Sequence, residues 1–145
     1  MRNCEIEQLE GSLREVLGAR PEIQEAYLFG SRARGQAGAH SDVDVAVYLD
    51  LALVPDFPFG YAAELSAGLM HTLGHGNIDV VVLNQAPPLL YHRAICQGVR
   101  LLARHGPATT TREGQALSRY CDYVVQLRKI DAAHAARIAR GSFGR

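Results

Sequence analysis

A glycine–serine turn is the first feature of this chain that could do chemistry. Gly30 and Ser31 follow an apolar, strand-like run at residues 27–29. Because glycine has no side chain, Gly30 lets the backbone approach a bulky group closely. Ser31 adds a hydroxyl and free backbone N–H groups at the start of an expected short helix, where an anion binds well. The turn therefore predicts a phosphate-binding site.

Two aspartates follow about ten residues later. Asp42 and Asp44 alternate with valines, and strand side chains alternate between faces, so both carboxylates should point to one face, about 7 Å apart. Aspartate is depleted in strands, and like charges on one face repel each other unless a cation lies between them. A hard divalent cation would suit such a pair. Alternatively, Arg32 and Arg34 could neutralise the pair, which would make the cluster purely structural.

A third acid, Asp79, lies near the start of an apolar run at residues 78–83, which we expect to be a buried strand. An unpaired carboxylate is costly in such a place. If this strand pairs beside residues 42–49, the three carboxylates converge, and three acids could hold two divalent ions that activate an attacking hydroxyl. The ordinary alternative is an aspartate that caps a turn after residues 76–77.

Other candidate residues give weaker signals. His71 and His75 have the spacing of a metal-binding pair, but no glutamate follows His71 and a glycine interrupts the helix, so we do not expect a zinc site. Tyr91, His92 and Arg93 could reach a nucleotide, although a helix that follows two prolines is equally compatible with a structural role.

These motifs resemble the signature of the DNA polymerase β-type nucleotidyltransferase superfamily, and more narrowly the minimal nucleotidyltransferase (MNT) proteins. The similarity covers residues from about 25 to 104. It rests on Gly30-Ser31-Arg32-Ala33-Arg34-Gly35, Ser41-Asp42-Val43-Asp44-Val45-Ala46-Val47, Ile78-Asp79-Val80-Val81-Val82-Leu83-Asn84, Pro87-Pro88-Leu89-Leu90 and Gly98-Val99-Arg100-Leu101-Leu102.

The resemblance implies an antitoxin that transfers AMP from ATP to a tyrosine hydroxyl of a cognate HEPN-domain ribonuclease toxin. It implies no direct nucleic-acid substrate. It assigns catalysis and the binding of two Mg²⁺ ions to Asp42, Asp44 and Asp79, and nucleotide binding to Gly30, Ser31, Arg32, Arg34 and Ser41. Two alternatives stay open: transfer of a nucleotide to a small molecule of the aminoglycoside type, and a non-catalytic module that silences the toxin by occlusion.

The composition is typical of a compact domain. The chain has 145 residues, enough to bury a core, and no run approaches the roughly 20 apolar residues of a membrane span. The N-terminus is acidic, unlike a signal peptide. An odd number of widely spaced cysteines argues against a disulfide framework, so we expect a protein of the reducing cytoplasm, with no membrane partner. The three are Cys4, Cys96 and Cys121.

The formal net charge is zero, yet the charges are divided along the chain. Up to Val80 there are twelve acidic and five basic residues, and from Val81 onward three acidic and ten basic residues. Fourteen of the fifteen basic residues are arginine, which favours bidentate contacts with phosphate or carboxylate. The basic C-terminal segment either binds a partner or is a solvated helix face.

The periodicity of the apolar residues predicts alternating helices and strands, and hence an α/β fold with a small mixed sheet, flanking helices and a C-terminal helical segment. We expect a nucleotidyltransferase domain over residues 1–105 and a helical extension of it over 106–145. The expected helices are 5–19, 61–73, one up to 97 that opens at the two prolines, and one or two from Thr111; the expected strands are 25–29, 42–49, 78–83 and 99–103, and residues 51–59 should form a loop.

Overall fold

The computed structural model describes residues 4–30 and 42–141. Its elements are, in chain order, α1 (Cys4–Gly18), β1 (Ile23–Phe29), β2 (Val43–Leu49), α2 (Tyr61–Leu73), β3 (Ile78–Val82), the 3₁₀ turn η1 (Leu83–Gln85), α3 (Pro88–Gln97), β4 (Val99–Ala103) and α4 (Gly106–Ala139). The expected α/β class and the flanking helices are confirmed. No helix in the described ranges is long and apolar enough to span a bilayer.

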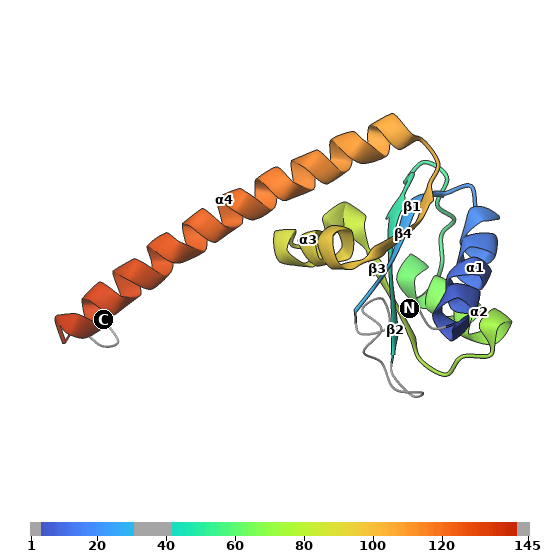
Figure 1. The fold of residues 1–145 in the computed structure, drawn as a ribbon, viewed down its shortest axis with the longest axis horizontal. Coiled ribbons are helices and arrows are strands. Elements are labelled where there is room, and N and C mark those ends of the chain that lie inside the picture. Colours follow the sequence, from blue (N-terminus) through green and yellow to red (C-terminus); the bar gives the residue numbers. More distant parts are fainter. Residues whose placement is uncertain (1–3, 31–41, 142–145) are drawn as a thin grey trace.

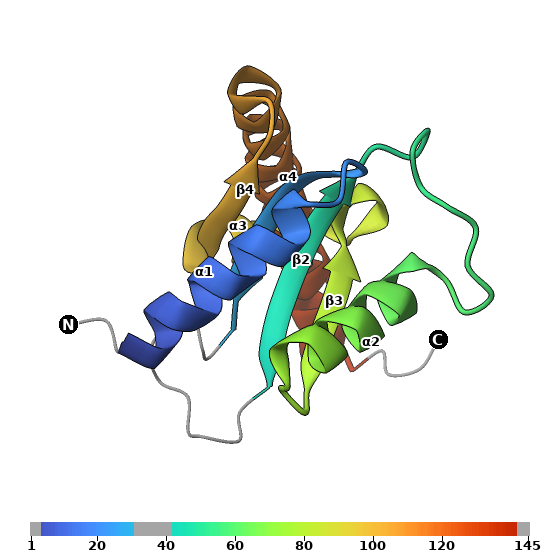
Figure 2. The same cartoon turned by 90° about the vertical axis from the view of Figure 1, so that its right-hand side faces the viewer.

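The four strands form one mixed sheet in the order β3-β2-β1-β4. β1 pairs antiparallel with both β2 and β4, whereas β2 and β3 run parallel. Helices α1 and α2 cover one face, α3 lies on the other, and α4 extends away from the sheet (Figures 1 and 2). The parallel pair is connected through α2, as the crossover between parallel strands requires.

The valines of β2 point into the main core. Val43, Val45 and Val47 are fully buried and pack with the apolar sides of α1 and α2. Leu65 and Leu69, one turn apart on α2, belong to the same cluster. This cluster explains the alternation in the sequence, because period-two burial on β2 leaves its other residues facing α3.

The second face carries a smaller cluster under α3. Ala46 of β2 and Tyr27 of β1 are buried there, together with Tyr91 and Ala94 of α3. Helix α3 begins at Pro88, the position at which proline suits a helix, and ends before Gly98, as predicted. A Cβ atom at position 98 would lie 2.2 Å from the Ala94 carbonyl oxygen, so this chain reversal requires glycine.

The third strand differs from the prediction. Residues 78–83 do not form a buried strand, because β3 lies at the sheet edge and ends at Val82. Within β3 only Ile78 is buried and Asp79 is exposed, while Leu83, just past the end of the strand, is buried again. An apolar run alone does not distinguish a central from an edge strand.

The C-terminal segment is a single 34-residue helix that starts at Gly106, earlier than expected. The apolar residues that recur at helical spacing along it form a stripe, namely Leu117, Tyr120, Cys121, Val124 and Leu127. This apolar stripe does not enter the core: Leu117 and Leu127 are exposed, and among the buried residues of α4 are Thr109 and Ala116 in its first part. In Figure 1 the helix leaves the sheet soon after it starts and continues away from the rest of the molecule. Most of its large apolar side chains are therefore exposed in the isolated chain.

Candidate functional site

Two of the predicted carboxylates lie side by side at the start of the parallel strand pair. Asp44 of β2 is in register with Asp79 of β3. Register partners in a parallel pair point to the same face and have backbones about 4.8 Å apart. Asp42 immediately precedes β2 and shares the alternation of Asp44 and Ala46, on the face that α3 covers. The strand pairing that would bring the three acids together is thus present.

Gly30 lies against this cluster. It ends β1 with a φ of 80°, in the region that L-residues rarely adopt. A Cβ atom at this position would lie 2.2 Å from Oδ2 of Asp44. Phe29, the preceding residue, is the register partner of Asp44 across the antiparallel pair. The sequence predicted that Gly30 lets the backbone approach a bulky group closely. In the described residues that group is the Asp44 carboxylate.

The electrostatics of the cluster act mainly on Asp44. Burial raises the pKa of its carboxyl above the ordinary value, and the negative charges of Asp79 and Asp42 raise it further. Among the described residues, no arginine or lysine forms an ion pair with these acids. The described part of the site therefore favours a positive charge.

The donor set fits a hard divalent cation. Carboxylate oxygens are the ligands that Mg²⁺ prefers, and Asp42 and Asp79 are exposed and free to turn. Within residues 4–30 and 42–141, no three His, Cys, Asp or Glu side chains are gathered as a finished metal site. The backbone thus places the three aspartates at one edge, and their side chains would have to close around a bound ion.

The other predicted residues fall into two groups. Ser31, Arg32, Arg34 and Ser41 lie outside the described residues, so their assignment to the nucleotide stays a prediction.

Residues 91 and 92 have structural contacts. The side chain of Tyr91, on α3, is buried against the sheet. The ring of His92 stacks on Tyr120 of α4 with centroids 3.7 Å apart. His75 accepts a hydrogen bond at Nδ1 from the backbone N–H of Asn77.

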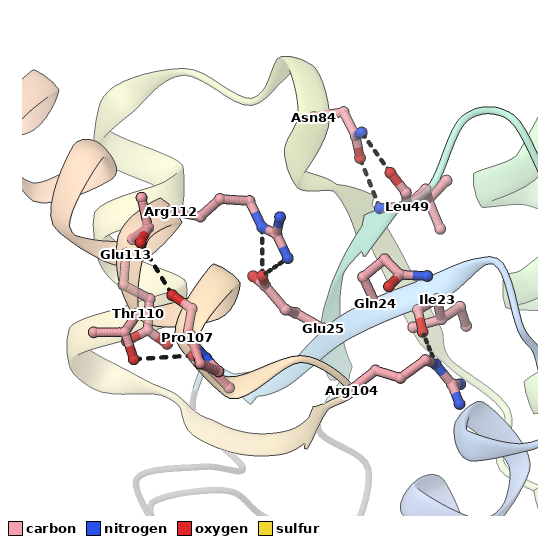
Figure 3. Close-up of polar contacts among 12 residues, drawn as sticks. Ile23, Gln24, Glu25, Leu49, Asn84, Arg104, Pro107, Thr110, Arg112 and Glu113 are labelled. Atoms are coloured by element: carbon pink, nitrogen blue, oxygen red, sulfur yellow. Dashed lines mark hydrogen bonds and ion pairs between the residues drawn. The ribbon is translucent and has the colours of Figure 1, made fainter.

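A buried charge cluster, which was not predicted from the sequence, joins α4 to β1. Glu25 is fully buried, and its carboxylate accepts hydrogen bonds from Nε and Nη2 of Arg112 (Figure 3). Tyr27 donates to Glu113 at 2.7 Å, and Glu113 also pairs with Arg100 of β4. A glutamate within a mostly apolar strand was the available signal, since an unpaired buried charge is too costly to persist.

One protein family matches most of the chain. Residues 12–106 match the model of the family described as Polymerase beta, Nucleotidyltransferase. The matched range contains β1, β2, β3 and β4, and with them every predicted site residue. No curated protein sequence matches the chain.

Solved structures share the fold. A crystal structure of a toxin–antitoxin with AMP-PNP superposes with a TM-score of 0.72 at 24% identity, over 87% of this chain and 98% of the other. A crystal structure of the toxin–antitoxin MntA–HepT gives 0.67 at 22% identity, over 89% and 98%. A tri-AMPylated Shewanella oneidensis HEPN toxin in complex with MNT antitoxin gives 0.66 at 21% identity, over 90% and 98%.

At these identities the superpositions establish the shared fold over 87–90% of this chain. The family match is independent of them and spans the sheet, the glycine turn and the three aspartates. The chain therefore belongs to the Polymerase beta, Nucleotidyltransferase family.

Proposed function

We propose that this protein is an antitoxin of the MNT type that transfers AMP from ATP to a tyrosine hydroxyl of a cognate HEPN ribonuclease toxin and so neutralises it. Three lines support the proposal: membership of the nucleotidyltransferase family, the common fold with toxin–antitoxin structures, and the AMP-PNP and tri-AMPylated toxin that two of those structures contain.

The observation that carries the proposal is the register of Asp44 with Asp79 on adjacent parallel strands. A mutually repelling carboxylate pair lowers the stability of a sheet unless the site uses it. Gly30 completes the arrangement, because its missing side chain leaves room for the Asp44 carboxylate in its observed position. A protein that merely occluded its partner would have no need of this arrangement.

In the proposed reaction, a tyrosine oxygen of the toxin attacks the α-phosphorus of ATP. A bond between this oxygen and phosphorus forms, the bond to the bridging oxygen of the β-phosphate breaks, and pyrophosphate leaves. A tyrosine hydroxyl with a pKa near 10 is almost wholly protonated at neutral pH, so its proton must be accepted. The exposed Asp79 carboxylate is the residue that we assign to this task.

The remaining residues bind and orient the donor. We assign the β- and γ-phosphates to the turn at Gly30 and Ser31, with Arg32, Arg34 and Ser41 as further phosphate contacts. Asp42, Asp44 and Asp79 would hold two Mg²⁺ ions, whose charge would neutralise the phosphates and favour the ionised acceptor oxygen.

Helix α4 supplies the surface that we assign to the toxin. Exposed apolar side chains continue along it beyond its contacts with α3, and basic residues accompany them. They include Tyr123, Leu127, Ile130, Arg128 and Lys129. Exposed apolar area of this kind is typical of a protein–protein contact.

The direct test is co-expression with the cognate HEPN toxin, followed by intact mass spectrometry of the purified toxin. With wild-type antitoxin, the toxin should gain mass in whole AMP units and stay inactive after the antitoxin is removed. With the Asp42→Asn/Asp44→Asn double variant, the toxin mass should be unmodified and cells should not be rescued. Asp56→Asn, an exposed residue of the loop after β2, is the matched control and should behave as wild type.

Occlusion gives the opposite result. If the double variant protects cells as well as wild type does, while the toxin mass is unmodified in both, the protein acts by binding alone. If purified enzyme instead transfers AMP to an aminoglycoside and never to the toxin, the small-molecule alternative holds.

A further inference from the structure

A cavity lies on the same face of the sheet as the carboxylates, at the opposite end of β2. It has a volume of about 470 Å³, within the usual range of small-molecule sites. Tyr48 lines it and lies four residues after Asp44, a distance of about 13 Å along the strand. Between them, Ala46 is buried beneath α3. The cavity is therefore separate from the carboxylate cluster.

One wall of the cavity is a guanidinium held in place. Arg112 lines the cavity, lies 4.4 Å from the centroid of the Tyr48 ring and pairs with the fully buried Glu25. Glu25 takes two of its three nitrogens, and Figure 3 shows the third pointing away from that carboxylate. Arg112 thus has donors left, in an orientation already fixed by a buried ion pair.

A second guanidinium lines the same cavity without an anionic partner. Arg119 lies one and a half to two turns further along α4 and covers the ring of Tyr91 at 5.9 Å. It forms no ion pair with any other residue in the described ranges. Since Glu25 balances Arg112 alone, the lining keeps one uncompensated positive charge.

A buried hydroxyl adds a further donor. Tyr91 lines the cavity, is 4% exposed, and its Oη atom has no hydrogen-bond partner among the described residues. Buried hydroxyls are normally paired, because an unmade hydrogen bond is costly. Burial, and next the negative charge of Glu25, raises the pKa of Tyr91 to about 12, so the hydroxyl keeps its proton at neutral pH.

The floor of the cavity is rigid. The Asn84 side chain donates to the Leu49 carbonyl and accepts from the Leu49 N–H, both at 2.9 Å (Figure 3). This double hydrogen bond ties η1 to the end of β2. Asn84 is thereby occupied, and the other polar side chains of the lining are those of Arg112, Arg119, Tyr91, Tyr48, Gln115 and Ser118.

We propose that this cavity binds the phosphate group of a small phosphate ester, held by Arg119, the Tyr91 hydroxyl and the remaining nitrogen of Arg112. The two arginines of α4 and Tyr91 of α3 offer several N–H and O–H donors, which suits the several oxygens of a tetrahedral phosphate better than the two of a planar carboxylate. The site is independent of the proposed adenylyl transfer, because it involves none of the three aspartates.

The test uses the full-length chain with chelator present, so that binding through Mg²⁺ at the aspartates makes no contribution. Inorganic phosphate, AMP, adenosine and acetate are each titrated while ¹H–¹⁵N spectra are recorded. Phosphate and AMP should saturate and shift the resonances of residues around Tyr48 and Arg119, and adenosine and acetate should not. Tighter binding of AMP would identify an organic phosphate ester as the ligand; equal affinity of free phosphate would show that the phosphate group alone is recognised.

Variants locate the site. Arg119→Gln should weaken phosphate binding about tenfold or more, because a charged hydrogen-bond partner is lost. Tyr91→Phe should weaken it several-fold. Arg128→Gln, an exposed arginine further along the same helix, is the matched control and should leave affinity unchanged.

Three results would overturn the proposal: no saturation by phosphate or AMP at millimolar concentrations, acetate or adenosine binding as tightly as AMP, or equal affinities of Arg119→Gln and Arg128→Gln. Arg119 is exposed, so its variant should fold even if Tyr91→Phe does not.

Discussion

Asp44 is the residue on which the geometry of the candidate site depends. It touches Gly30, faces Asp79 in register and follows Asp42, and its carboxyl has a raised pKa because of burial and these neighbouring charges. A raised native pKa means that the folded state binds more protons than the unfolded chain. The stability that this carboxyl contributes is therefore lost as the pH rises from the ordinary pKa of an aspartate, 3.8, towards the raised pKa of Asp44 in the folded protein.

The variant Asp44→Asn should consequently be more stable than wild type in chelator, with a difference that grows as pH rises. The difference should be small near pH 3, where the carboxyl is protonated in both states, and reach its full value at neutral pH. Urea unfolding followed by circular dichroism at several pH values measures it. Asp56→Asn should show no such trend, and a difference independent of pH would contradict the repulsion argument.

Gly30→Ala should destabilise the protein for two separable reasons. The positive φ costs about 1–2 kcal/mol for a residue with a side chain, and the new Cβ displaces Asp44. In the Asp44→Ala background the clash is relieved and only the backbone cost remains. Chemical unfolding of wild type, Gly30→Ala, Asp44→Ala and the double variant measures both effects. The loss of unfolding free energy caused by Gly30→Ala should be smaller in the Asp44→Ala background; equal losses in the two backgrounds would show that Asp44 is not displaced.

At the scale of elements, α4 is held to the sheet by charges rather than by its apolar stripe. The Arg112–Glu25 pair connects α4 to β1, and the Glu113–Arg100 pair connects it to β4. Each places a charged side chain from the first turns of the helix against a strand. Because Glu25 is fully buried, the first pair matters more than an exposed one of the same geometry.

Arg112→Gln should lower the free energy of unfolding by about 3–5 kcal/mol, since it leaves the Glu25 carboxylate buried and unpaired. Arg128→Gln, which changes the same residue type on the exposed part of α4, should alter it by less than about 0.5 kcal/mol. Urea denaturation at pH 7 compares them. A loss below about 1 kcal/mol for Arg112→Gln would mean that water reaches Glu25.

The whole molecule consists of a packed sheet domain and a helix, α4, that extends beyond it (Figure 1). The stack of Tyr120 on His92 joins α4 to α3 in the first half of the helix. Beyond it lie exposed apolar residues that no part of the described chain covers, among them Val125, Ile130 and Ile138. Stability and partner binding should therefore reside in different parts of one helix.

A chain that ends after Val125 should keep the stability of the full-length protein but lose association with the toxin. A chain that ends after Ala108 should be much less stable, because it lacks Arg112 and the buried Ala116. Thermal melts and co-purification with the HEPN protein compare the two. If the chain that ends after Val125 binds the toxin as well as the full-length protein does, the docking surface does not lie on the end of α4.

The sequence alone determined the features that depend on local pattern. The alternation of valine with aspartate placed two carboxylates on one strand face, the helix end at Gly74 followed from the backbone preference of glycine, and the glycine–serine motif indicated the family that the match confirmed. Each of these is encoded within a few neighbouring residues.

Only the tertiary structure decided which distant segments meet. It put Asp79 beside Asp44 by placing β3 parallel to β2, made β3 an edge strand, paired Glu25 with Arg112 and left the stripe of α4 uncovered. The physical reason is that periodicity reports which side of an element is apolar, whereas the partner of that side depends on strand order, chain path and charge pairing across many residues.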